Sequence, residues 1–279
     1  MLSYRHGFHA GNFADVLKHS LLTLAINSLK QKDKPFVYID THAGAGKYAL
    51  HAEFAQKTGE YQQGIGRLWQ ADQIPEVARD YLAAVRAENT GNQLLRYPGS
   101  PQLVRRLVRS QDRLQLSELH SSDYEALQQL FAGDKQVSVI KEDGLQMLEK
   151  KLPPIQRRGL VLIDPSYEVK SDYNKIVTTL TTAHRHFATG IYALWYPVID
   201  RQTTENMLQK LAATGISKQL RIEHSISSDS AVRGMTGSGM LFINPPWQLI
   251  EQAQVLLPWL NQQLANNQGQ WQIVWQVPE

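Results

Sequence analysis

Short, nearly continuous hydrophobic runs recur along the chain, and each of them ends in a loop of polar residues, glycine or proline. A run of this kind is typical of a β-strand in a sheet that helices cover on both faces. The pattern predicts six segments that run from a strand into a loop, followed by one final strand. These segments are PFVYIDTHAGAG, RLQLSELH, QVSVIKEDG, GLVLIDPSY, GIYALWYP and GMLFINPPW, and then WQIVWQVP.

Helical periodicity occupies the stretches between these strands. Hydrophobic residues recur about every 3.6 positions in four of them, which predicts helices over 122–132, 144–152, 174–188 and 203–215. Strands that alternate with helices form a parallel sheet with helices on both faces. The fold class is therefore expected to be α/β, with a doubly wound, mostly parallel sheet.

One interval departs from this alternation. After the first strand and its loop, the next strand does not begin until about residue 113. Residues 50–97 instead contain EYQQGIGRLWQA and PEVARDYLAAVRAENTG, which both have helical spacing. We interpret residues 50–97 as an inserted helical subdomain, and residues 1–49 and 98–279 as the core that surrounds it.

Composition limits the classes of protein to consider. A chain of 279 residues, with 42% hydrophobic and 20% charged residues, is typical of one globular domain with an insertion. The net charge of +3 permits an anionic partner without requiring one. The absence of cysteine excludes disulfides, thiolate metal sites and cysteine nucleophiles. Neither a signal peptide nor a membrane-spanning run is recognisable, so we expect a soluble, cytoplasmic protein.

The glycine-containing loop after the first strand, DTHAGAGKY, fits some nucleotide-binding motifs and not others. A phosphate-binding P-loop is excluded, because Thr41 replaces its first glycine and Tyr48 replaces its metal-binding hydroxyl residue. Gly44, Gly46 and Ala49 satisfy a dinucleotide fingerprint. The acidic residue that this motif requires about twenty residues later would, however, fall inside the helical insertion.

An S-adenosylmethionine loop is the third interpretation, and Asp40, Ala43, Gly44 and Gly46 match it. Enzymes that use this cofactor need an acid after the second strand, because a carboxylate can accept hydrogen bonds from both ribose hydroxyls. Glu118 stands at that position in SELH.

Further candidates follow the third and fourth strands. Asp143 and Gly144 follow the third, and Asp143 can accept a hydrogen bond from the exocyclic amine of the cofactor's adenine. The fourth strand ends in DPSY. An acid at one strand end is more often only solvated, but four such ends in order line one crevice of a parallel sheet, and together they predict an S-adenosylmethionine site.

Two loops compete for the chemistry of methyl transfer to an amine. The delocalised lone pair of an amino group on a base is a poor nucleophile, so catalysis needs oxygens that accept its protons. In DPSY, the Asp164 side chain and the Pro165 carbonyl would accept them, and Tyr167 would stack on a flipped base. In NPPW, Asn244 fits the usual letters better, but its strand comes two places too late. We therefore favour Asp164, and expect Ser166 to affect mainly the rigidity of the loop.

The N-terminal sequence SYRHGFHAGNFADVLKH is rich in histidine, aromatic and basic residues. A helix that begins near Asn12 would place Lys18 and His19 where they could reach a carboxylate such as that of the cofactor's methionine. His6 and His9 are three residues apart, but no cluster of carboxylates completes a metal site, so no metal is expected. On these residues alone, a solvated arm remains the alternative.

The whole chain resembles a known family. YRHGFHAGNFADVLKH, DTHAGAGKY, YPGSP, SELH, KEDG, LIDPSY and GIYALWYP are similar to the motifs of the RlmJ-type large-subunit ribosomal RNA adenine-N6 methyltransferases. The family motif has proline where Ser166 stands. The resemblance implies a Rossmann-like class I methyltransferase fold with an inserted helical subdomain, S-adenosyl-L-methionine as the methyl donor, and one adenine of protein-free large-subunit ribosomal RNA as the acceptor. It also implies an N-terminal tail, residues 1–12, that covers the cofactor site.

The resemblance also assigns roles to residues. Its motifs imply that the cofactor-binding residues are His19, His42, Ser100, Glu118, Asp143 and Gly144, and Gly44 joins them from the S-adenosylmethionine loop described above. They imply that Asp164 is the catalytic acceptor, and we place Tyr4 and His6 on the RNA side. Lys18 is added to the cofactor site on the strength of its charge alone. We expect the protein to act as a monomer.

Other functions remain open at this point. DNA adenine and protein glutamine methyltransferases use similar four-residue loops, so the acceptor could be DNA or protein. A non-catalytic RNA-binding or assembly factor, in which Ser166 marks a decayed site, is an alternative outside this class. A nicotinamide-dependent dehydrogenase would rest only on the incomplete dinucleotide fingerprint.

Overall fold

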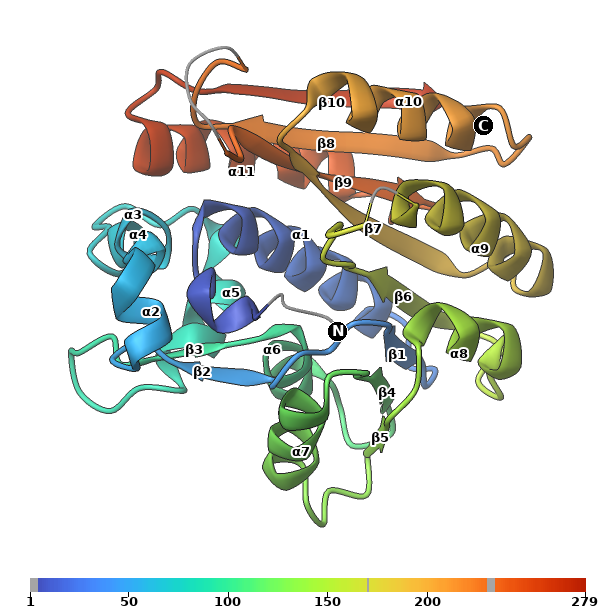
Figure 1. Cartoon of the computed structure of the whole chain (residues 1–279), viewed down its shortest axis with the longest axis horizontal. Coiled ribbons are helices and arrows are strands. Elements are labelled where there is room, and N and C mark those ends of the chain that lie inside the picture. The colour runs from blue at the N-terminus through green and yellow to red at the C-terminus, as the bar shows by residue number, and fades with distance from the viewer. Residues whose placement is uncertain (1–4, 170, 230–233) are drawn as a thin grey trace.

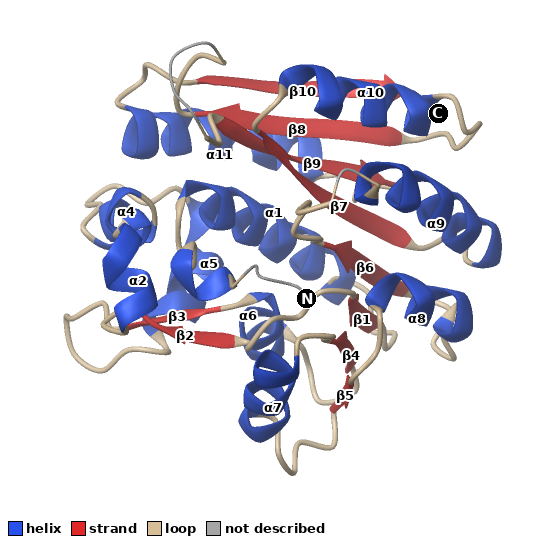
Figure 2. Cartoon of the chain, viewed as in Figure 1, coloured by secondary structure: helices blue, strands red, loops and turns tan. Residues whose placement is uncertain are grey.

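One eight-stranded sheet organises the protein (Figures 1 and 2). The computed structural model describes residues 5–169, 171–229 and 234–279. The sheet has the strand order β10-β8-β9-β7-β6-β1-β4-β5. Its strands are β1 (Val37–Asp40), β4 (Arg113–Ser117), β5 (Val137–Ile140), β6 (Gly159–Ile163), β7 (Ile191–Val198), β8 (Gln219–Ser225), β9 (Gly237–Ile243) and β10 (Gln270–Val277).

Strand direction divides this sheet into two parts. β5, β4, β1, β6 and β7 are parallel to one another. β9 is antiparallel to both β7 and β8, and β10 is antiparallel to β8. The predicted α/β fold with a mostly parallel sheet is confirmed, and the seven predicted strands are all present. The antiparallel end of the sheet and strand β8 were not predicted.

Helices cover both faces of the sheet (Figure 2). In β6, Leu160 and Leu162 belong to the core on one face, whereas Val161 and Ile163 belong to the core on the other. Every residue of β6 is therefore buried, which explains its continuous hydrophobic run. The helices are α1 (Phe13–Lys30), α6 (Ser100–Leu107), α7 (Ser121–Leu130), α8 (Gly144–Lys151), α9 (Asp172–His186), α10 (Arg201–Ala212) and α11 (Leu249–Ala265). None of the helices in the described residues is long and apolar enough to cross a membrane.

The hydrophobic pattern located some of these elements better than others. Helices α7 to α10 agree with the predicted ranges to within three residues at each end. Strand β8 escaped prediction because Arg221 and Glu223 interrupt its hydrophobic sequence, QLRIEHS. The structure pairs these two charges with each other at 2.6 Å, so that both are accommodated within the sheet.

The predicted insertion leaves and rejoins the core at one place. Strand β2 (Lys47–Ala49) pairs antiparallel with β3 (Arg96–Pro98), so the two ends of the segment between them lie side by side. Its helices are α2 (Glu53–Thr58), α3 (Glu60–Gln63), α4 (Ile65–Trp69) and α5 (Glu76–Arg86). Buried residues of this segment, such as Leu68 and Tyr81, belong to the same hydrophobic core as Tyr38 of β1. The division into a core and a subdomain stays a prediction.

The described part of the N-terminal tail packs against the insertion. It forms a short 3-10 helix, η1 (His6–Phe8), before α1 begins. The hydroxyl of Thr58 donates to the carbonyl of Phe8 at 2.5 Å, and the amide of Ile65 donates to the carbonyl of Gly11 at 2.8 Å. The His9 Nδ1 atom lies 3.0 Å from both carboxylate oxygens of Glu60. The tail is therefore held against the insertion by hydrogen bonds to its backbone carbonyls and by the His9–Glu60 pair.

This pair predicts a pH dependence of tail docking. The hydrogen bond to Glu60 raises the pKa of His9 above its ordinary value of 6.5. Because the folded-state pKa is raised, the stabilisation is complete below that ordinary value and is lost as pH rises through the raised one. Hydrogen-exchange protection factors of residues 8–11, corrected for intrinsic rates, should fall as pH rises from the ordinary value of 6.5 through the raised pKa of His9.

The matched control for this experiment is Glu60→Gln. It removes the carboxylate that raises the pKa of His9 and keeps a side chain of similar size. Protection of the same residues should then depend much less on pH. A fall of equal size in the wild type and in Glu60→Gln would show that the His9–Glu60 pair does not control docking.

Candidate active site

A cavity of about 790 Å³ opens at the carboxyl ends of the parallel strands. Loops that follow β1, β4, β5 and β6 line it with Thr41, Glu118, Asp143 and Asp164, and the end of β7 adds Pro197. The carboxyl edge of such a sheet is where ligands usually bind, and the volume falls in the range of small-molecule sites. The structure therefore gathers the predicted strand-end residues around one space.

Gly44 brings the first loop of the cavity close to the second. Its φ angle of +59° lies in the left-handed region, and a Cβ atom there would come within 2.3 Å of the Tyr48 hydroxyl oxygen. Glycine is thus required at this position. The amide of Gly44 donates to Oε2 of Glu118 at 2.7 Å, which fixes the Glu118 carboxylate against the loop.

Glu118 also accepts a hydrogen bond from the His120 amide at 2.7 Å, through Oε1. Burial raises the pKa of Glu118, and the amides of His120 and Gly44 act in the opposite direction. Each oxygen of a carboxylate can accept more than one hydrogen bond. Glu118 therefore retains the capacity to accept from ligand hydroxyls inside the cavity.

Asp143 and Gly144 begin α8 at the wall of the cavity. Oδ1 of Asp143 caps the helix by accepting from the Leu145 amide at 2.9 Å, and Oδ2 accepts from Lys175 Nζ at 2.7 Å. A Cβ atom on Gly144 would lie 1.8 Å from the Thr41 carbonyl oxygen, so only glycine allows this approach of the two loops. The side chain of Asp143 thus has a structural partner on each oxygen as well as its place in the cavity wall.

Ser100 lies at the start of α6 and is bonded to the buried acid of the first strand. Its hydroxyl donates to Oδ2 of Asp40 at 2.7 Å, and the Tyr38 hydroxyl donates to the same oxygen at 2.7 Å. Burial raises the pKa of Asp40 to about 6. Because the Ser100 proton points to Asp40, the Ser100 oxygen is left to act as an acceptor toward the cavity.

The two predicted histidines of the cofactor site are both bonded to hydroxyl groups. Nδ1 of His19 lies 2.7 Å from the hydroxyl of Tyr97, which is itself 3.0 Å from the hydroxyl of Tyr81. Burial lowers the pKa of His19 to about 3, so its ring is neutral. Nδ1 of His42 lies 2.7 Å from Oγ1 of Thr41, and both histidines line the cavity.

Lys18 is placed by the start of helix α1. Asn12 caps this helix by accepting from the amides of Ala14 and Asp15 at 3.0 Å, and Lys18 follows Asp15 by one turn. Nζ of Lys18 lies 2.8 Å from Oδ1 of Asp15 and 2.6 Å from Oδ2 of Asp164. Burial lowers the pKa of Lys18, but the two carboxylates outweigh it and raise the pKa above its ordinary value, so Lys18 stays charged.

His6 completes this cluster from the N-terminal tail. Its Nε2 atom lies 2.9 Å from Oδ2 of Asp15, the carboxylate that also binds Lys18. His6 therefore reaches the same charged group as the start of α1, and it lines the cavity. Tyr4, the other residue predicted on the RNA side, lies outside the described residues. Within the described ranges, no group of three or more His, Asp or Glu side chains could hold a metal ion.

The DPSY loop brings Asp164, Pro165 and Ser166 to the cavity, whereas Tyr167 is not among the lining residues. Tyr167 has a φ angle of +54°, its hydroxyl donates to the Trp195 carbonyl at 2.7 Å, and its ring centroid lies 4.6 Å from that of Tyr173. Its predicted stacking on a base therefore requires a different placement of its ring, and that role stays a prediction.

Trp195 provides an aromatic ring at this end of the cavity instead. It lines the cavity, and its ring centroid lies 5.4 Å from Nζ of Lys18. Sequence reasoning missed it because GIYALWYP is a continuous hydrophobic strand, in which nothing distinguishes a cavity-facing tryptophan from a core residue.

The NPPW loop lies at the opposite edge of the sheet. Because β9 is antiparallel to β7, the residue before Asn244 pairs with Tyr192 at the amino end of β7. The Asn244 side chain donates to the carbonyls of Ala188 and Gly190, both at 2.8 Å, and Trp247 is 74% exposed. The direction of its strand therefore takes Asn244 away from the cavity.

Comparison with known proteins identifies the family. The profile of the family described as ribosomal RNA large subunit methyltransferase D, RlmJ, matches residues 33–277. Over the full length of both chains, this protein is 54% identical to ribosomal RNA large subunit methyltransferase J of Escherichia coli (strain K12), and 50% identical to the protein of that name from Haemophilus influenzae.

Solved structures agree with this result. The crystal structure of a protein from Legionella pneumophila is 38% identical, has a TM-score of 0.90, and is covered over 98% of its length by 96% of this chain. A probable spermidine synthase from Corynebacterium glutamicum, 12% identical with a TM-score of 0.51 over 94% of this chain and 75% of that one, shares the fold alone. The Rossmann-like class I methyltransferase fold that the resemblance implied is thereby confirmed, and the chain belongs to the RlmJ family of ribosomal RNA large subunit methyltransferases.

Proposed function

We propose that this protein transfers the methyl group of S-adenosylmethionine to the N6 atom of one adenine in protein-free large-subunit ribosomal RNA. Family membership and the names of the two relatives support ribosomal RNA of the large subunit as the substrate. The observation that carries the proposed chemistry is the position of Asp164. It ends the fourth parallel strand of the core, binds a buried lysine, and faces the cavity that the predicted cofactor loops enclose.

The residues of the cavity fit the parts of the proposed cofactor. Glu118 would accept hydrogen bonds from the ribose hydroxyls, and Asp143 from the adenine amine. The acceptor oxygen of Ser100 would suit the ammonium group of the methionine end, near the neutral rings of His19 and His42. The close approaches at Gly44 and Gly144 support this assignment, since they bring the loops that carry Glu118 and Asp143 together around the cavity. When bound, S-adenosylmethionine supplies an electrophilic methyl group.

Asp164 and Pro165 would act on the acceptor amine. The Asp164 carboxylate and the Pro165 carbonyl would accept the two N6 protons, which favours a tetrahedral nitrogen as the new C–N bond forms. Once N6 carries the methyl group and a positive charge, one of its protons passes to Asp164 and from there to solvent. Lys18 fixes the orientation of the Asp164 carboxylate through the 2.6 Å contact.

The N-terminal tail would add residues to the wall of the cavity. His6 lines the cavity and is bonded to Asp15, and His9 lines it and is bonded to Glu60. These contacts support the proposal that residues 1–12 cover the cofactor site, with Tyr4 and His6 on the side where RNA enters. Ser166, which also lines the cavity, would make the DPSY loop less rigid than the proline of the family motif.

Replacement of Asp164 should abolish most of the methyl transfer. We expect Asp164→Ala to lower kcat by at least about a hundredfold, because the carboxylate that accepts the N6 protons is lost. The assay uses labelled S-adenosylmethionine and protein-free large-subunit RNA from cells that lack the gene. Calorimetry should show that the Asp164 variant binds S-adenosylhomocysteine with an affinity similar to that of the wild type.

The same assay decides between acceptors. Duplex DNA and a glutamine-containing peptide, offered as competing substrates, should remain unmethylated. A wild-type reaction that makes no more N6-methyladenine than Asp164→Ala would contradict the proposed function. Preferred transfer to DNA or to the peptide would show that the proposed acceptor is wrong, while the reaction would still be methyl transfer.

Glu118 offers a separate test of the cofactor assignment. Glu118→Ala should weaken S-adenosylhomocysteine binding by roughly ten- to a hundredfold, since hydrogen bonds to a charged group are lost. Isothermal titration calorimetry measures this change. Glu125→Gln, an acid on the exposed face of α7, is the control and should bind as the wild type does. Equal affinities of Glu118→Ala and Glu125→Gln would remove Glu118 from the cofactor site.

A further inference from the structure

An apolar wall closes the cavity on the side away from the glycine loop. Ile199 comes from the segment after β7, and Ile226 and Met235 come from the two ends of the connection between β8 and β9. In the proposed function, the cofactor occupies the side of Glu118 and Asp143. The apolar wall then lies on the side where an acceptor base would enter.

Backbone hydrogen bonds fix the base of this β8–β9 connection. The amide of Ile226 donates to the carbonyl of Thr236 at 2.9 Å. The amide of Thr236 in turn donates to the carbonyl of Val198 at 2.9 Å. These bonds hold Ile226 and Met235 in a defined position relative to the end of β7. The position of the wall therefore depends on how firmly the base of the connection is held.

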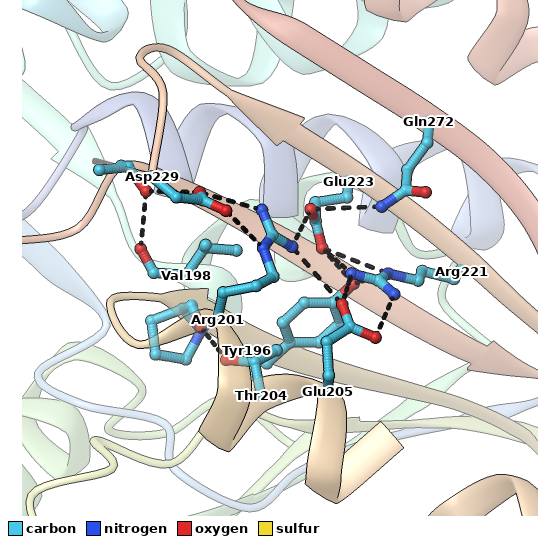
Figure 3. Close-up of polar contacts among 11 residues, drawn as sticks. Tyr196, Val198, Arg201, Thr204, Glu205, Arg221, Glu223, Asp229 and Gln272 are labelled. Atoms are coloured by element: carbon cyan, nitrogen blue, oxygen red, sulfur yellow. Dashed lines mark hydrogen bonds and ion pairs between the residues drawn. The ribbon is translucent and has the colours of Figure 1, made fainter. Parts of the chain in front are cut away.

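Arg201, the first residue of α10, joins this connection to the sheet (Figure 3). Its Nε and Nη2 atoms donate to the two carboxylate oxygens of Asp229 at 2.8 and 3.2 Å, and its Nη1 atom donates to Glu223 at 2.5 Å. One planar guanidinium thus binds the loop through one edge and strand β8 through the other. Lysine could not make the same set of bonds, because its ammonium group is a single point charge.

Glu223 provides a rigid anchor for Arg201. It is almost completely buried in β8, and it also accepts hydrogen bonds from Arg221 at 2.6 Å and from the Tyr196 hydroxyl at 3.0 Å. Arg221 is bonded in addition to Glu205 of α10 at 2.6 Å. Strand β7, strand β8 and helix α10 are therefore tied into one network, whose outermost member is Asp229 (Figure 3).

Stability alone is a poor explanation for this network. Buried ion pairs are often no more stabilising than hydrophobic residues of similar size, because their charges must leave water. The network instead fixes the position of Asp229, whose carboxylate also accepts a hydrogen bond from the Thr236 hydroxyl at 3.3 Å. The hydrogen bond from Arg201 lowers the pKa of Asp229 and keeps the bridge charged.

We propose that the Arg201–Asp229 bridge is a positioning device for the acceptor: it holds Ile226 and Met235 where the target base enters, and so controls the use of RNA without affecting the cofactor. This inference rests on the proposed function. Arg201 and Asp229 act through the wall and do not touch the reacting atoms.

The test compares Asp229→Ala with Glu205→Gln. Both variants remove one carboxylate partner from the same network, at comparable exposures of 45% for Asp229 and 31% for Glu205, but only Asp229 belongs to the β8–β9 connection. Asp229→Ala should lower kcat/KM for RNA by roughly tenfold, because a misplaced wall misorients the acceptor. Glu205→Gln should stay within about twofold of the wild type, and both should bind S-adenosylhomocysteine with unchanged Kd.

The variant Arg201→Lys and a hydrogen-exchange measurement test the bridge further. Arg201→Lys keeps the positive charge and should give a smaller loss of kcat/KM than Asp229→Ala, since a single contact to Asp229 or Glu223 remains possible. The amides of Ile226 and Thr236 should lose protection in Asp229→Ala and keep it in Glu205→Gln.

Three outcomes would overturn the inference: wild-type kcat/KM in Asp229→Ala, equal losses in Asp229→Ala and Glu205→Gln, or a Kd for S-adenosylhomocysteine that changes in parallel with kcat/KM. A wild type without methyl transfer would instead overturn the proposed function. In that case hydrogen exchange alone would test the inference. Unchanged protection of the Ile226 and Thr236 amides in Asp229→Ala would count against the bridge as a positioning device.

Discussion

The contact between Lys18 and Asp164 is the interaction on which the arrangement of the candidate site depends. It joins helix α1, near the N-terminus, to the loop after β6, and the ammonium group is buried between two carboxylates. A buried charge is tolerated only when it is paired, and the loop after β6 supplies one of the two carboxylates that compensate the buried ammonium group. The same pair that fixes the chain at this point also contains the carboxylate oxygen that the proposed chemistry needs.

The sequence contained enough to place the cofactor side of the cavity. Gly44, Glu118 and Asp143 follow hydrophobic runs that have the pattern of strands, and parallel strands end at one edge of the sheet. The acceptor side was not predictable in the same way. Trp195 lies within a strand of mostly core residues, and the charges of β8 are paired only in the folded structure. The partner of Lys18 is 146 residues away, a separation that no local pattern reveals.

Strand direction explains why two similar loops have different positions. DPSY and NPPW both follow buried strands and both contain an acceptor side chain before proline. β6 is parallel to β1 and β7, but β9 runs the other way, so its last residue meets the first residues of β7. The residues of such a motif therefore indicate a site only when the direction of the preceding strand is also known.

The hydroxyl groups of Tyr81 and Tyr97 connect the insertion to the cavity. Tyr81 belongs to α5, Tyr97 to β3, and the chain of hydrogen bonds ends at Nδ1 of His19. The two attachment points at β2 and β3 make the insertion look exchangeable between relatives as a block. A chimaera that exchanges only the segment between β2 and β3 would keep its backbone junctions and yet lose the Tyr81 hydroxyl that contacts Tyr97, unless the transplanted segment also brings a hydroxyl to that position.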